Sequence, residues 1–493
     1  MSVLDQLRQQ GVVPHRLTAD SRRVQPGDVF VAFPGAHADG RDFIAQAVQR
    51  GAAAVIAEAG TKARVGAGDA PIIEVARLSS LCGEIAHLVY GRPSEKLWLA
   101  GVTGTNGKTS VSQWIAQAMD ALGQRCAVVG TLGNGFVHAL AESPNTTPDA
   151  ITLHAALAGF VERGAKACAM EVSSIGLDQG RVNGAAFDVA VFTNLTRDHL
   201  EYHGSMEAYA EAKARLFEMP GLDAAVLNLD DAFGRELARR FRGCLPTLGY
   251  TLGAEAGETD EILRAENLRM SAAGIEFELR GATIAAPVVG RFNASNLLAV
   301  IAALLSRGEA LDAIAAALRS LRPPPGRMQA LGGHGQPLVV VDYAHTPDAL
   351  EKALTVLRET ATARGGKLVC VFGCGGERDP GKRPQMGAVA EALADSVLVT
   401  SDNPRGEDPQ AIIDGIVSGM KNRPSVQVER ARAVADAIAA ADARDVVLLA
   451  GKGHEPYQEV AGVRHVYSDL DAAQSAFAGP RSGVPGRQGQ ARR

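Results

Sequence analysis

The sequence predicts an α/β protein built around mostly parallel sheets and divided into three domains. Two observations predict this fold class. Short apolar runs alternate with stretches of helical periodicity along most of the 493 residues, which is the pattern of parallel strands covered by helices. Polar or charged residues follow many of these runs directly, and the ligand sites of open α/β sheets lie at the carboxyl ends of strands. We therefore expect the polar side chains to converge.

Residues 1–92 form the first predicted domain, a small α/β unit. A helical stretch is expected at Phe43–Arg50. Buried strands are expected at Val29–Phe33, Ala52–Ala57 and Ile72–Val75. The turn-forming segment Gly91–Ser94 then interrupts the pattern and marks the boundary.

Residues 93–322 form the second predicted domain, which contains a doubly covered, mostly parallel sheet. Its strands are expected at Trp98–Val102, Cys126–Gly130, Ala167–Val172, Val189–Asn194 and Ala224–Leu229. The polar residues at or after these strands are Lys108, Thr109, Thr146, Thr147, Glu171, Asn194, Asp230 and Asp231. Three consecutive prolines, Pro323–Pro325, end the domain.

Residues 323–479 form the third predicted domain. Strands are expected at Leu338–Val341, Leu368–Phe372, Ser396–Thr400 and Val446–Leu449. Polar segments follow these strands at Asp342–His345, Gly373–Arg378, Asp402–Arg405 and Gly451–Glu455. The last fourteen residues, 480–493, contain four arginines and no acid among Gly, Ser and Gln, which predicts a disordered tail.

Composition excludes several classes of protein. A hydrophobic content of 46%, a charged content of 21% and a net charge of −5 are typical of a globular protein and argue against a general nucleic-acid binder. No apolar run approaches the length of a membrane span, and the N-terminus lacks a signal-peptide core. The six cysteines show no C-x-x-C pairing, which favours reduced thiols. We expect a cytoplasmic monomer that binds neither nucleic acid nor membranes.

A glycine-rich loop, Gly101–Ser110, is the most informative segment. It follows an apolar run and opens onto a helical pattern, so backbone N–H groups and a helix N-terminus would face an anion. Lys108 adds positive charge, and Thr109 offers a hydroxyl to Mg²⁺. Val102 stands where the strict G-x-x-x-x-G-K-[ST] spacing requires glycine, so the working glycines are Gly104 and Gly107. The loop predicts binding of a nucleoside triphosphate.

Two further segments carry acids and histidines. Glu171 ends a predicted strand, where a carboxylate can hold Mg²⁺ against a triphosphate; the alternative is a buried carboxylate bonded to a neighbour. The segment Asn194–Gly204 contains one Asp, one Glu and two His in eleven residues. Such a density favours a site, although a single histidine there is also compatible with a solvated surface.

Together these motifs resemble the Mur ligases. The resemblance rests on Thr103–Thr109, Asn145–Pro148, Glu171–Ser174, Asn194–His203, Ala212–Phe217 and Asp342–Pro347, and it covers nearly the whole chain except the tail. It implies three domains: one for a UDP-sugar, a central ATPase-like domain and a C-terminal Rossmann-like domain for an incoming amino acid. It also implies an ATP- and Mg²⁺-dependent ligase of peptidoglycan synthesis, and hence of cell-wall biogenesis, cell shape and cell division. In this reaction ATP activates a carboxylate as an acyl phosphate for attack by an amine.

The resemblance assigns residues to each substrate. Catalysis is assigned to Lys108, Lys213, His199 and Glu171. For ATP it implies Gly104, Thr105, Asn106, Gly107, Lys108, Thr109, Ser110, Asn293, Asn296, Arg327 and Asp342. For the UDP-sugar dipeptide it implies Ser21, Ala36, His37, Ala38, Asn145, Thr146, Thr147, Ser173, Gln179 and Arg181. For Mg²⁺ it implies Thr109, Glu171, His199 and a carbamylated Lys213. From composition alone Lys213 would be an exposed helix cation, and the two asparagines would serve equally well as helix caps.

The resemblance also implies diaminopimelate as the incoming amino acid. The residues assigned to it are Arg378, Asp402, Asn403, Pro404, Arg405, Gly451 and Glu455. Diaminopimelate has a second carboxylate at its far end, which the guanidinium of Arg405 can bind through two hydrogen bonds. Lysine lacks this group and would leave the guanidinium unpaired in a closed pocket. Glu455 is expected to meet the distal ammonium.

Three alternatives stay open at this stage. One is a lysine-adding Mur ligase, which Arg405 disfavours. Another is an amide ligase like folylpolyglutamate synthetase, which lacks both the UDP-binding domain and the Asp402–Arg405 pocket. The last is a nucleotide-dependent binding module without catalysis. One departure from the family pattern is Ile175, where a histidine is frequent.

Overall fold

The computed structural model describes residues 2–35, 38–60, 70–253, 258–271, 274–333 and 335–478. The chain forms two compact units. The first unit comprises Met1–Thr196 and Tyr202–Arg322, and the second comprises Arg197–Glu201 and Pro323–Arg493. The division into three domains stays a prediction.

The N-terminal part of the first unit is a four-stranded parallel sheet in the order β1-β2-β3-β4. Its strands are β1 (Leu17–Thr18), β2 (Val29–Ala32), β3 (Ala54–Glu58) and β4 (Ile72–Val75). Its helices are α1 (Val3–Gln9), α2 (Ile44–Gln49) and α3 (Leu78–Val89). Alternate residues of β2 point to opposite faces: Val29 and Val31 pack with α1 and α3, and Phe30 packs with α2.

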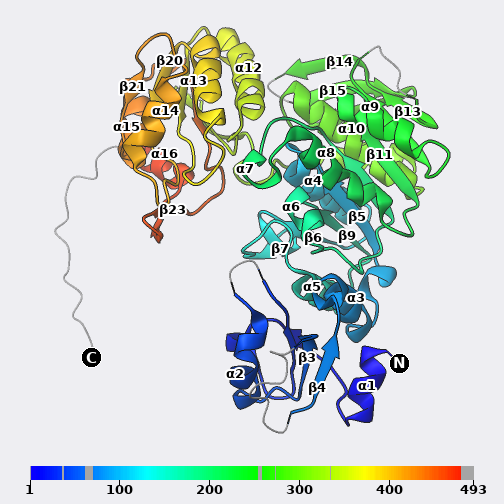
Figure 1. Ribbon diagram of the computed structural model, residues 1–493. Coiled ribbons are helices and arrows are strands. Elements are labelled where there is room, and N and C mark those ends of the chain that lie inside the picture. The colour runs from blue at the N-terminus through cyan, green and yellow to red at the C-terminus, as the bar shows by residue number, and fades with distance from the viewer. Residues whose placement is uncertain are drawn as a thin grey trace. The chain divides into compact units, whose positions relative to one another are not determined.

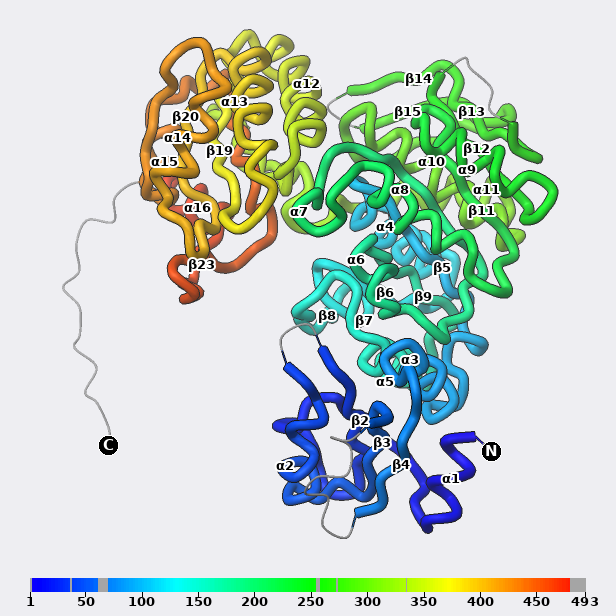
Figure 2. Tube along the Cα trace, in the orientation of Figure 1, coloured from blue at the N-terminus to red at the C-terminus, as the bar shows by residue number. Residues whose placement is uncertain are grey.

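A nine-stranded sheet forms the centre of the first unit, in the order β13-β12-β11-β10-β5-β9-β6-β7-β8. The seven strands from β13 to β6 pair in parallel, and β7 and β8 extend the edge in antiparallel pairing. Figure 2 shows β7 and β8 near β6 at this edge. The strands are β5 (Trp98–Thr103), β6 (Cys126–Gly130), β7 (Gly133–Phe136), β8 (Ala139–Ala141), β9 (Ala167–Glu171), β10 (Val189–Phe192), β11 (Ala224–Asn228), β12 (Thr247–Thr251) and β13 (Glu261–Arg264).

Helices cover both faces of this sheet (Figure 1). They are α4 (Lys108–Ala121), α5 (Ala150–Glu162), α6 (Ser174–Asp178), α8 (Met206–Ala214), α9 (Ala232–Phe241), α10 (Arg291–Ser306) and α11 (Leu311–Leu318). In β10, Val189 and Val191 pack with α4 and α10, whereas Ala190 and Phe192 pack with α9. Because both faces are buried, the strands are continuous apolar runs, as the sequence predicted.

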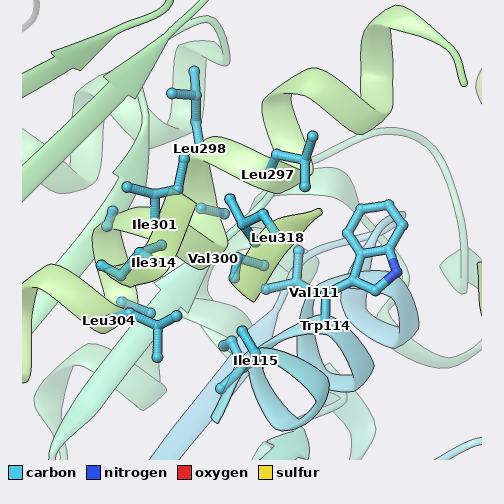
Figure 3. Packing of buried hydrophobic residues seen from close by; sticks show 14 of the residues in the cluster. Val111, Trp114, Ile115, Leu297, Leu298, Val300, Ile301, Leu304, Ile314 and Leu318 are labelled. Atoms are coloured by element: carbon cyan, nitrogen blue, oxygen red, sulfur yellow. The ribbon is translucent and has the colours of Figure 1, made fainter. Parts of the chain in front are cut away.

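The largest core lies between α4, α10 and α11. Figure 3 shows Val111, Trp114 and Ile115 of α4 with residues of α10 and α11. The indole Nε1 of Trp114 donates to the carbonyl of Arg322 at 3.0 Å, which ties the end of the first unit to α4. A three-stranded antiparallel sheet packs on the same core and comprises β14 (Glu266–Ser271), β15 (Gly274–Leu279) and β16 (Ala282–Ala286).

The second unit contains a six-stranded sheet in the order β17-β18-β22-β19-β20-β21, parallel except for β17. The strands are β17 (Gln329–Gly332), β18 (Leu338–Asp342), β19 (Leu368–Phe372), β20 (Ser396–Val399), β21 (Ser425–Val426) and β22 (Val446–Ala450). A separate hairpin consists of β23 (Tyr457–Val460) and β24 (Val463–Val466). The helices are α12 (Pro347–Arg364), α13 (Lys382–Leu393), α14 (Pro409–Val417), α15 (Arg430–Ala440) and α16 (Asp469–Ala478).

Local signals explain the ends of α12. The hydroxyl of Thr346 accepts a hydrogen bond from the backbone N–H of Ala349, and Pro347 occupies the first turn. Gly365, with φ of 65°, ends the helix in the left-handed conformation. The helices α15 and α16 pack against one face of the sheet, where their apolar residues join those of β18, β19 and β22.

The α/β fold class is confirmed, and the predicted strands match the observed ones to within about two residues at their ends. The antiparallel additions β7–β8, β14–β16, β17 and β23–β24 were not predicted. All six cysteines are free, and only Cys244 is exposed. The predicted tail at 480–493 lies outside the described residues. In the part of the chain that the structure describes, no helix is both long and apolar enough to cross a membrane.

Candidate active site

The glycine-rich loop connects β5 to the N-terminus of α4. Gly104 and Gly107 have φ of 143° and 91°, a region that residues with a Cβ rarely adopt. Neither has room for a side chain: a Cβ on Gly104 would lie 1.9 Å from Thr193 Oγ1, and one on Gly107 would lie 2.6 Å from Asn296 Oδ1. The two glycines named from the sequence are therefore those that the loop conformation requires.

Two lysines converge on this loop. The Nζ of Lys108 donates to the carbonyls of Gly104 and Thr105, each at 2.9 Å. The Nζ of Lys213, on α8, donates to the same Gly104 carbonyl at 3.0 Å. Lys213 is 1% exposed, so the expectation from composition of an exposed cation is wrong. Its Nζ also lies 4.2 Å from the centre of the Tyr209 ring. The Lys108 ammonium at the N-terminus of α4 suits a polyanionic phosphate chain.

Glu171 at the end of β9 is fully buried and lies against the first turn of α4. Its Oε2 accepts a hydrogen bond from Thr109 Oγ1 at 2.9 Å and one from Thr131 Oγ1 at 3.1 Å. Its Oε1 accepts from the backbone N–H of Thr131 at 2.9 Å. The carboxylate is thus held in one orientation by the ends of two strands and the start of a helix.

Thr131 was missed by the sequence analysis, although it follows β6 directly and the strand-end rule would have found it. Its hydroxyl also lies 3.0 Å from Thr146 Oγ1. It therefore connects the carboxylate assigned to Mg²⁺ with a residue assigned to the UDP-sugar dipeptide.

The other residues assigned to the sugar-peptide lie close to this network. Thr147 Oγ1 donates to the Glu171 carbonyl at 2.9 Å and accepts from the Ser173 N–H at 3.0 Å. Arg181 Nη1 donates to the Thr147 carbonyl at 2.9 Å, and its Nε and Nη2 both donate to Gln179 Oε1. Burial lowers the pKa of Arg181. These contacts give the guanidinium a fixed direction.

The N-terminal candidates are described only in part. Ser21 is buried, and its hydroxyl donates to Gln46 Oε1 at 2.6 Å. Ala38 and Asn145 are exposed. Ala36 and His37 lie outside the described residues. The assignment of this pocket to the UDP group stays a prediction.

Asn296 lies beside the phosphate loop, and neither Asn296 nor its partner Asn293 caps α10. The N-cap of α10 is Gly290, and no side chain caps this helix. The alternative of helix caps is therefore wrong for the two asparagines. Asn296 Nδ2 donates to Asn293 Oδ1 at 3.1 Å, and Asn293 Nδ2 donates to the Val289 carbonyl at 2.7 Å. The proximity of Asn296 to Gly107, inferred above from the Cβ position, favours a role near the nucleotide.

Asp230 and Asp231, which follow β11, serve the local fold. Asp231 accepts backbone hydrogen bonds at the start of α9 and one from the Leu195 N–H at 2.9 Å. Asp230 Oδ1 accepts from Thr251 Oγ1, and Oδ2 accepts from the Leu252 N–H. The expectation that these two acids join the site is therefore not met by their observed contacts.

His199 belongs to the Arg197–Glu201 segment of the second unit and directly precedes α7 (Leu200–His203). Its Nε2 lies 3.5 Å from Asp198, and its Nδ1 lies 3.5 Å from Glu201. Burial alone would raise the pKa of Asp198, but His345, His199 and Lys382 hold this pKa far below its usual value. His199 has φ of 54°, and such strained positions cluster at functional sites.

Arg327 and Asp342 both lie in the second unit. Asp342 ends β18, and its Oδ2 accepts from the Met328 N–H at 2.8 Å. Burial raises the pKa of Asp342, and the charge of Arg327 opposes that shift. The guanidinium of Arg327 lies 4.7 Å from the centre of the Tyr343 ring. Their assignment to ATP stays a prediction.

A pocket of charged groups lies at the carboxyl ends of β22, β19 and β20. Arg405, with φ of 53°, donates from Nη1 to the Gly376 carbonyl at 2.7 Å, and its Nε lies 3.9 Å from Glu459. A Cβ on Gly375 would lie 3.0 Å from Arg405 Nη1 and 3.7 Å from Arg378 Cγ, so the two arginine side chains flank this glycine. The arrangement suits a carboxylate.

The acidic part of this pocket is a closed hydrogen-bond network. Asn403 Nδ2 donates to Glu455 Oε2 at 2.8 Å, and Lys452 Nζ donates to Asn403 Oδ1 at 3.0 Å and Glu455 Oε2 at 2.9 Å. Gly451 has φ of 110°, and a Cβ there would lie 2.5 Å from Asp402 Oδ2. A side chain at position 451 would therefore displace the Asp402 carboxylate.

The hairpin β23–β24 covers the Asp402–Arg405 segment. Gln458 Nε2 donates to the Asp402 carbonyl at 2.6 Å, and the Glu459 N–H donates to Asn403 Oδ1 at 2.9 Å. Neither residue was predicted from the sequence, and no role was predicted for Lys452. No local pattern marks Gln458 or Glu459, whereas Lys452 lies within the polar segment that follows β22.

Within the described ranges, no three His, Cys, Asp or Glu side chains lie together in a way that would hold a metal ion. The oxygen donors of Thr109 and Glu171 nevertheless fit Mg²⁺, because proteins bind this ion through one or two carboxylates with phosphates and waters. The residues assigned to diaminopimelate all follow the carboxyl ends of β19, β20 and β22.

The chain matches known proteins over most of its length. Residues 14–90 match the Mur ligase family catalytic domain, 102–304 the Mur ligase middle domain, and 326–453 the Mur ligase glutamate ligase domain. The chain is 53% identical over 480 residues to UDP-N-acetylmuramoyl-L-alanyl-D-glutamate–2,6-diaminopimelate ligase of Ectopseudomonas mendocina, covering 95% of this chain and 96% of that protein. It is 54% identical over 468 residues to the ligase of the same name from Pseudomonas aeruginosa, covering 94% of each. A solved structure of a ligase with this name aligns with a TM-score of 0.66 at 38% identity, covering 94% of this chain and 95% of that one.

Proposed function

This chain belongs to the Mur ligase family, and from that membership we propose that it adds meso-2,6-diaminopimelate to UDP-N-acetylmuramoyl-L-alanyl-D-glutamate. ATP is converted to ADP and phosphate, and the product is an amide in the cytoplasmic synthesis of peptidoglycan precursors. Its substrates are ATP, the UDP-sugar dipeptide and diaminopimelate, and its cofactor is Mg²⁺.

One observation carries this proposal, namely the pocket around Arg405 in the second unit. A phosphate loop alone is compatible with many nucleotide-dependent proteins. A guanidinium and a hydrogen-bonded carboxylate in one pocket, by contrast, match the carboxylate and ammonium groups of an amino acid. Arg405 favours diaminopimelate over lysine, because lysine has no second carboxylate to accept hydrogen bonds from that guanidinium.

The chemistry requires activation of a carboxylate. An amine does not displace oxygen from a carboxylate, so the γ-phosphoryl group of ATP is first transferred to the terminal D-Glu carboxylate. The amine of diaminopimelate then attacks the acyl phosphate, a tetrahedral intermediate forms, and phosphate leaves. Lys108 supplies a positive charge beside the phosphate loop, where charge moves during transfer. When bound, Mg²⁺ neutralises charge on the phosphates, and Thr109 and Glu171 are the residues that would hold it.

We propose that Lys213 is carbamylated in the active enzyme, and the assignment of His199 to Mg²⁺ stays a prediction from the resemblance. The modification would convert a buried cation beside Gly104 into an anion able to bind a second Mg²⁺. Intact mass or electron density of fresh protein should show one added carbon dioxide on Lys213. An active preparation with an unmodified amine would refute this assignment.

The decisive experiment measures phosphate release with each substrate omitted in turn. We expect release only when the UDP-sugar dipeptide, diaminopimelate and ATP are all present, with the tripeptide product seen by mass spectrometry. Lys108→Ala is the inactive control. ATP hydrolysis whose rate does not depend on the UDP-sugar dipeptide or diaminopimelate would favour a binding module. Equal use of L-lysine and diaminopimelate would favour a lysine-adding ligase.

A further inference from the structure

Lys452 is a fully buried lysine in the loop after β22. Its Nζ lies 3.0 Å from Asn403 Oδ1, 2.9 Å from Glu455 Oε2 and 3.9 Å from Asp402 Oδ1. Taking an ammonium group out of water costs several kcal/mol unless the group is paired, and here it has three oxygen partners. The lysine is therefore an interior part of this cluster, with its ammonium paired by side-chain oxygens.

The ammonium determines how Asn403 is oriented. A lysine can only donate hydrogen bonds, so the oxygen of the Asn403 amide must face it. The Glu459 N–H donates to the same oxygen at 2.9 Å. The amide nitrogen is then directed to Glu455 Oε2 at 2.8 Å. Lys452 Nζ and Asn403 Nδ2 both donate to Glu455 Oε2. Among the described residues, none donates a hydrogen bond to the other oxygen, Glu455 Oε1.

The charges of the pocket leave one negative charge without a counterpart. With both carboxylates ionised, Asp402 and Glu455 carry two negative charges and Lys452 carries one positive charge. The nearby Arg430 and Asp469 neutralise each other, since they form a fully buried pair at 2.7 Å. Arg405 and Glu459 likewise offset each other at 3.9 Å. One ammonium group would make the Asp402–Lys452–Glu455 cluster neutral.

We propose that Lys452 is a positioning residue that, directly and through Asn403, sets Glu455 to accept the second ammonium group of diaminopimelate. The inference rests on the proposed function and deepens it. Arg405 would recognise the carboxylate at the far end of the amino acid, and the cluster held by Lys452 would recognise the amine beside it. Lys452 itself acts through its neighbours.

The test compares meso-diaminopimelate with 2-aminopimelate, which keeps both carboxylates and lacks the second amine. 2-Aminopimelate is used as a substrate or, where turnover is below detection, as a competitive inhibitor. For Lys452→Met we expect kcat/KM for diaminopimelate to fall at least 30-fold, mostly through KM. The constant for 2-aminopimelate should change less than threefold, and KM for ATP and for the UDP-sugar dipeptide less than twofold. Lys352→Met, at a partly exposed lysine of α12 far along the chain from this cluster, is the matched control and should resemble the wild type.

The pH profile provides a second readout that loss of structure alone would not produce. The groups facing Asp402 are Lys452, Arg430, Glu455 and Asp469, and burial raises the pKa of Asp402 while Lys452 opposes that shift. Tyr343 also lies close to Glu455 and Asp402. Without the ammonium, the pKa of Asp402 rises further, because the charge that opposes the effect of burial is gone. The acid limb of kcat/KM for diaminopimelate should therefore move upward in Lys452→Met and stay in place in Lys452→Arg.

Two outcomes would overturn the inference: equal losses for the two amino acids in Lys452→Met, or no loss for either. Should Lys452→Met fail to fold, Lys452→Arg decides. Its planar guanidinium keeps the charge but not the donor geometry, so KM for diaminopimelate should rise at least fivefold with 2-aminopimelate unaffected. An arginine variant identical to the wild type would then refute the positioning role. A wild type that does not use diaminopimelate at all would instead refute the proposed function.

Discussion

Replacing Arg405 with methionine should convert a diaminopimelate-selective pocket into one that barely distinguishes this amino acid from lysine. In the structure Arg405 Nη1 binds the Gly376 carbonyl at 2.7 Å and Nε faces Glu459 at 3.9 Å, while Nη2 donates to no described residue. The guanidinium can thus give a substrate carboxylate two charge-assisted hydrogen bonds. Each contributes about 1.5–3 kcal/mol.

The magnitude follows from these bonds. Because the Arg405 side chain is 20% exposed, we take the lower end, about 3 kcal/mol for the pair. At about 1.4 kcal/mol per factor of ten, kcat/KM for diaminopimelate should fall about 150-fold. L-Lysine has no second carboxylate, so its kcat/KM should change less than about threefold by the same reasoning.

The assay is phosphate release with each amino acid varied at saturating ATP and UDP-sugar dipeptide. Arg405→Lys keeps the charge without the planar pair of donors and should fall between the wild type and Arg405→Met. Arg432→Met removes an exposed arginine of α15 and serves as the control. An unchanged preference for diaminopimelate over lysine, or an equal rise in KM for ATP, would refute the specificity argument.

Three further predictions address the network around Glu171, a buried ion pair and a buried histidine. In Gly130→Ala the new Cβ would lie 2.2 Å from Glu171 Oε1 and displace the carboxylate. The Mg²⁺ concentration that gives half the maximal rate should therefore rise at least fivefold. An unchanged Mg²⁺ titration would contradict this prediction. Arg430→Met leaves Asp469 buried without its cation and should destabilise the second unit by about 3–5 kcal/mol, measured by hydrogen exchange of β22. Adding Asp469→Leu should restore more than half of the lost stability. No recovery in the double variant would contradict the ion-pair explanation. Burial lowers the pKa of His154 from 6.5 to about 4, so its neutral form stabilises the fold above pH 6.5 and this contribution is lost as pH falls toward 4. At pH 4 the loss of stability is about 3 kcal/mol. The thermal unfolding temperature of His154→Gln should therefore depend less on pH between 6.5 and 4 than that of the wild type. Parallel pH profiles of the two proteins would disprove this prediction.

Much of the architecture could be predicted because the signals are local. The apolar runs at Cys126–Gly130 and Leu368–Phe372 coincide with β6 and β19, since strands buried on both faces must be apolar throughout. Gly104 and Gly107 were identified from spacing, and their positive φ follows from the turn that connects a strand to a helix. The strand-end rule also placed Glu171 and Asp402 near their partners.

Contacts between distant segments were beyond such patterns. Lys213 looked like a surface cation, yet its Nζ binds the carbonyl of Gly104, 109 residues earlier in the chain. Asp230 and Asp231 looked like site acids, yet Asp231 caps α9 and Asp230 accepts a hydrogen bond from the Leu252 N–H after β12. Nothing in its own neighbours marks Gln458 as a partner of Asp402, because the hairpin β23–β24 reaches that loop only after the chain has folded.

The order of residues along this chain was therefore sufficient to determine its α/β class, its phosphate loop and the strand ends where chemistry gathers, because these depend on periodicity, on glycine and on charge within about ten residues. The tertiary structure alone decided which polar groups meet. Lys452 and Asn403, 49 residues apart, come into contact because β22 lies beside β19 and β19 beside β20 in the sheet. Hydrogen bonds extend only about 3 Å, so a pocket of this kind exists only once the sheet has fixed the positions of its loops.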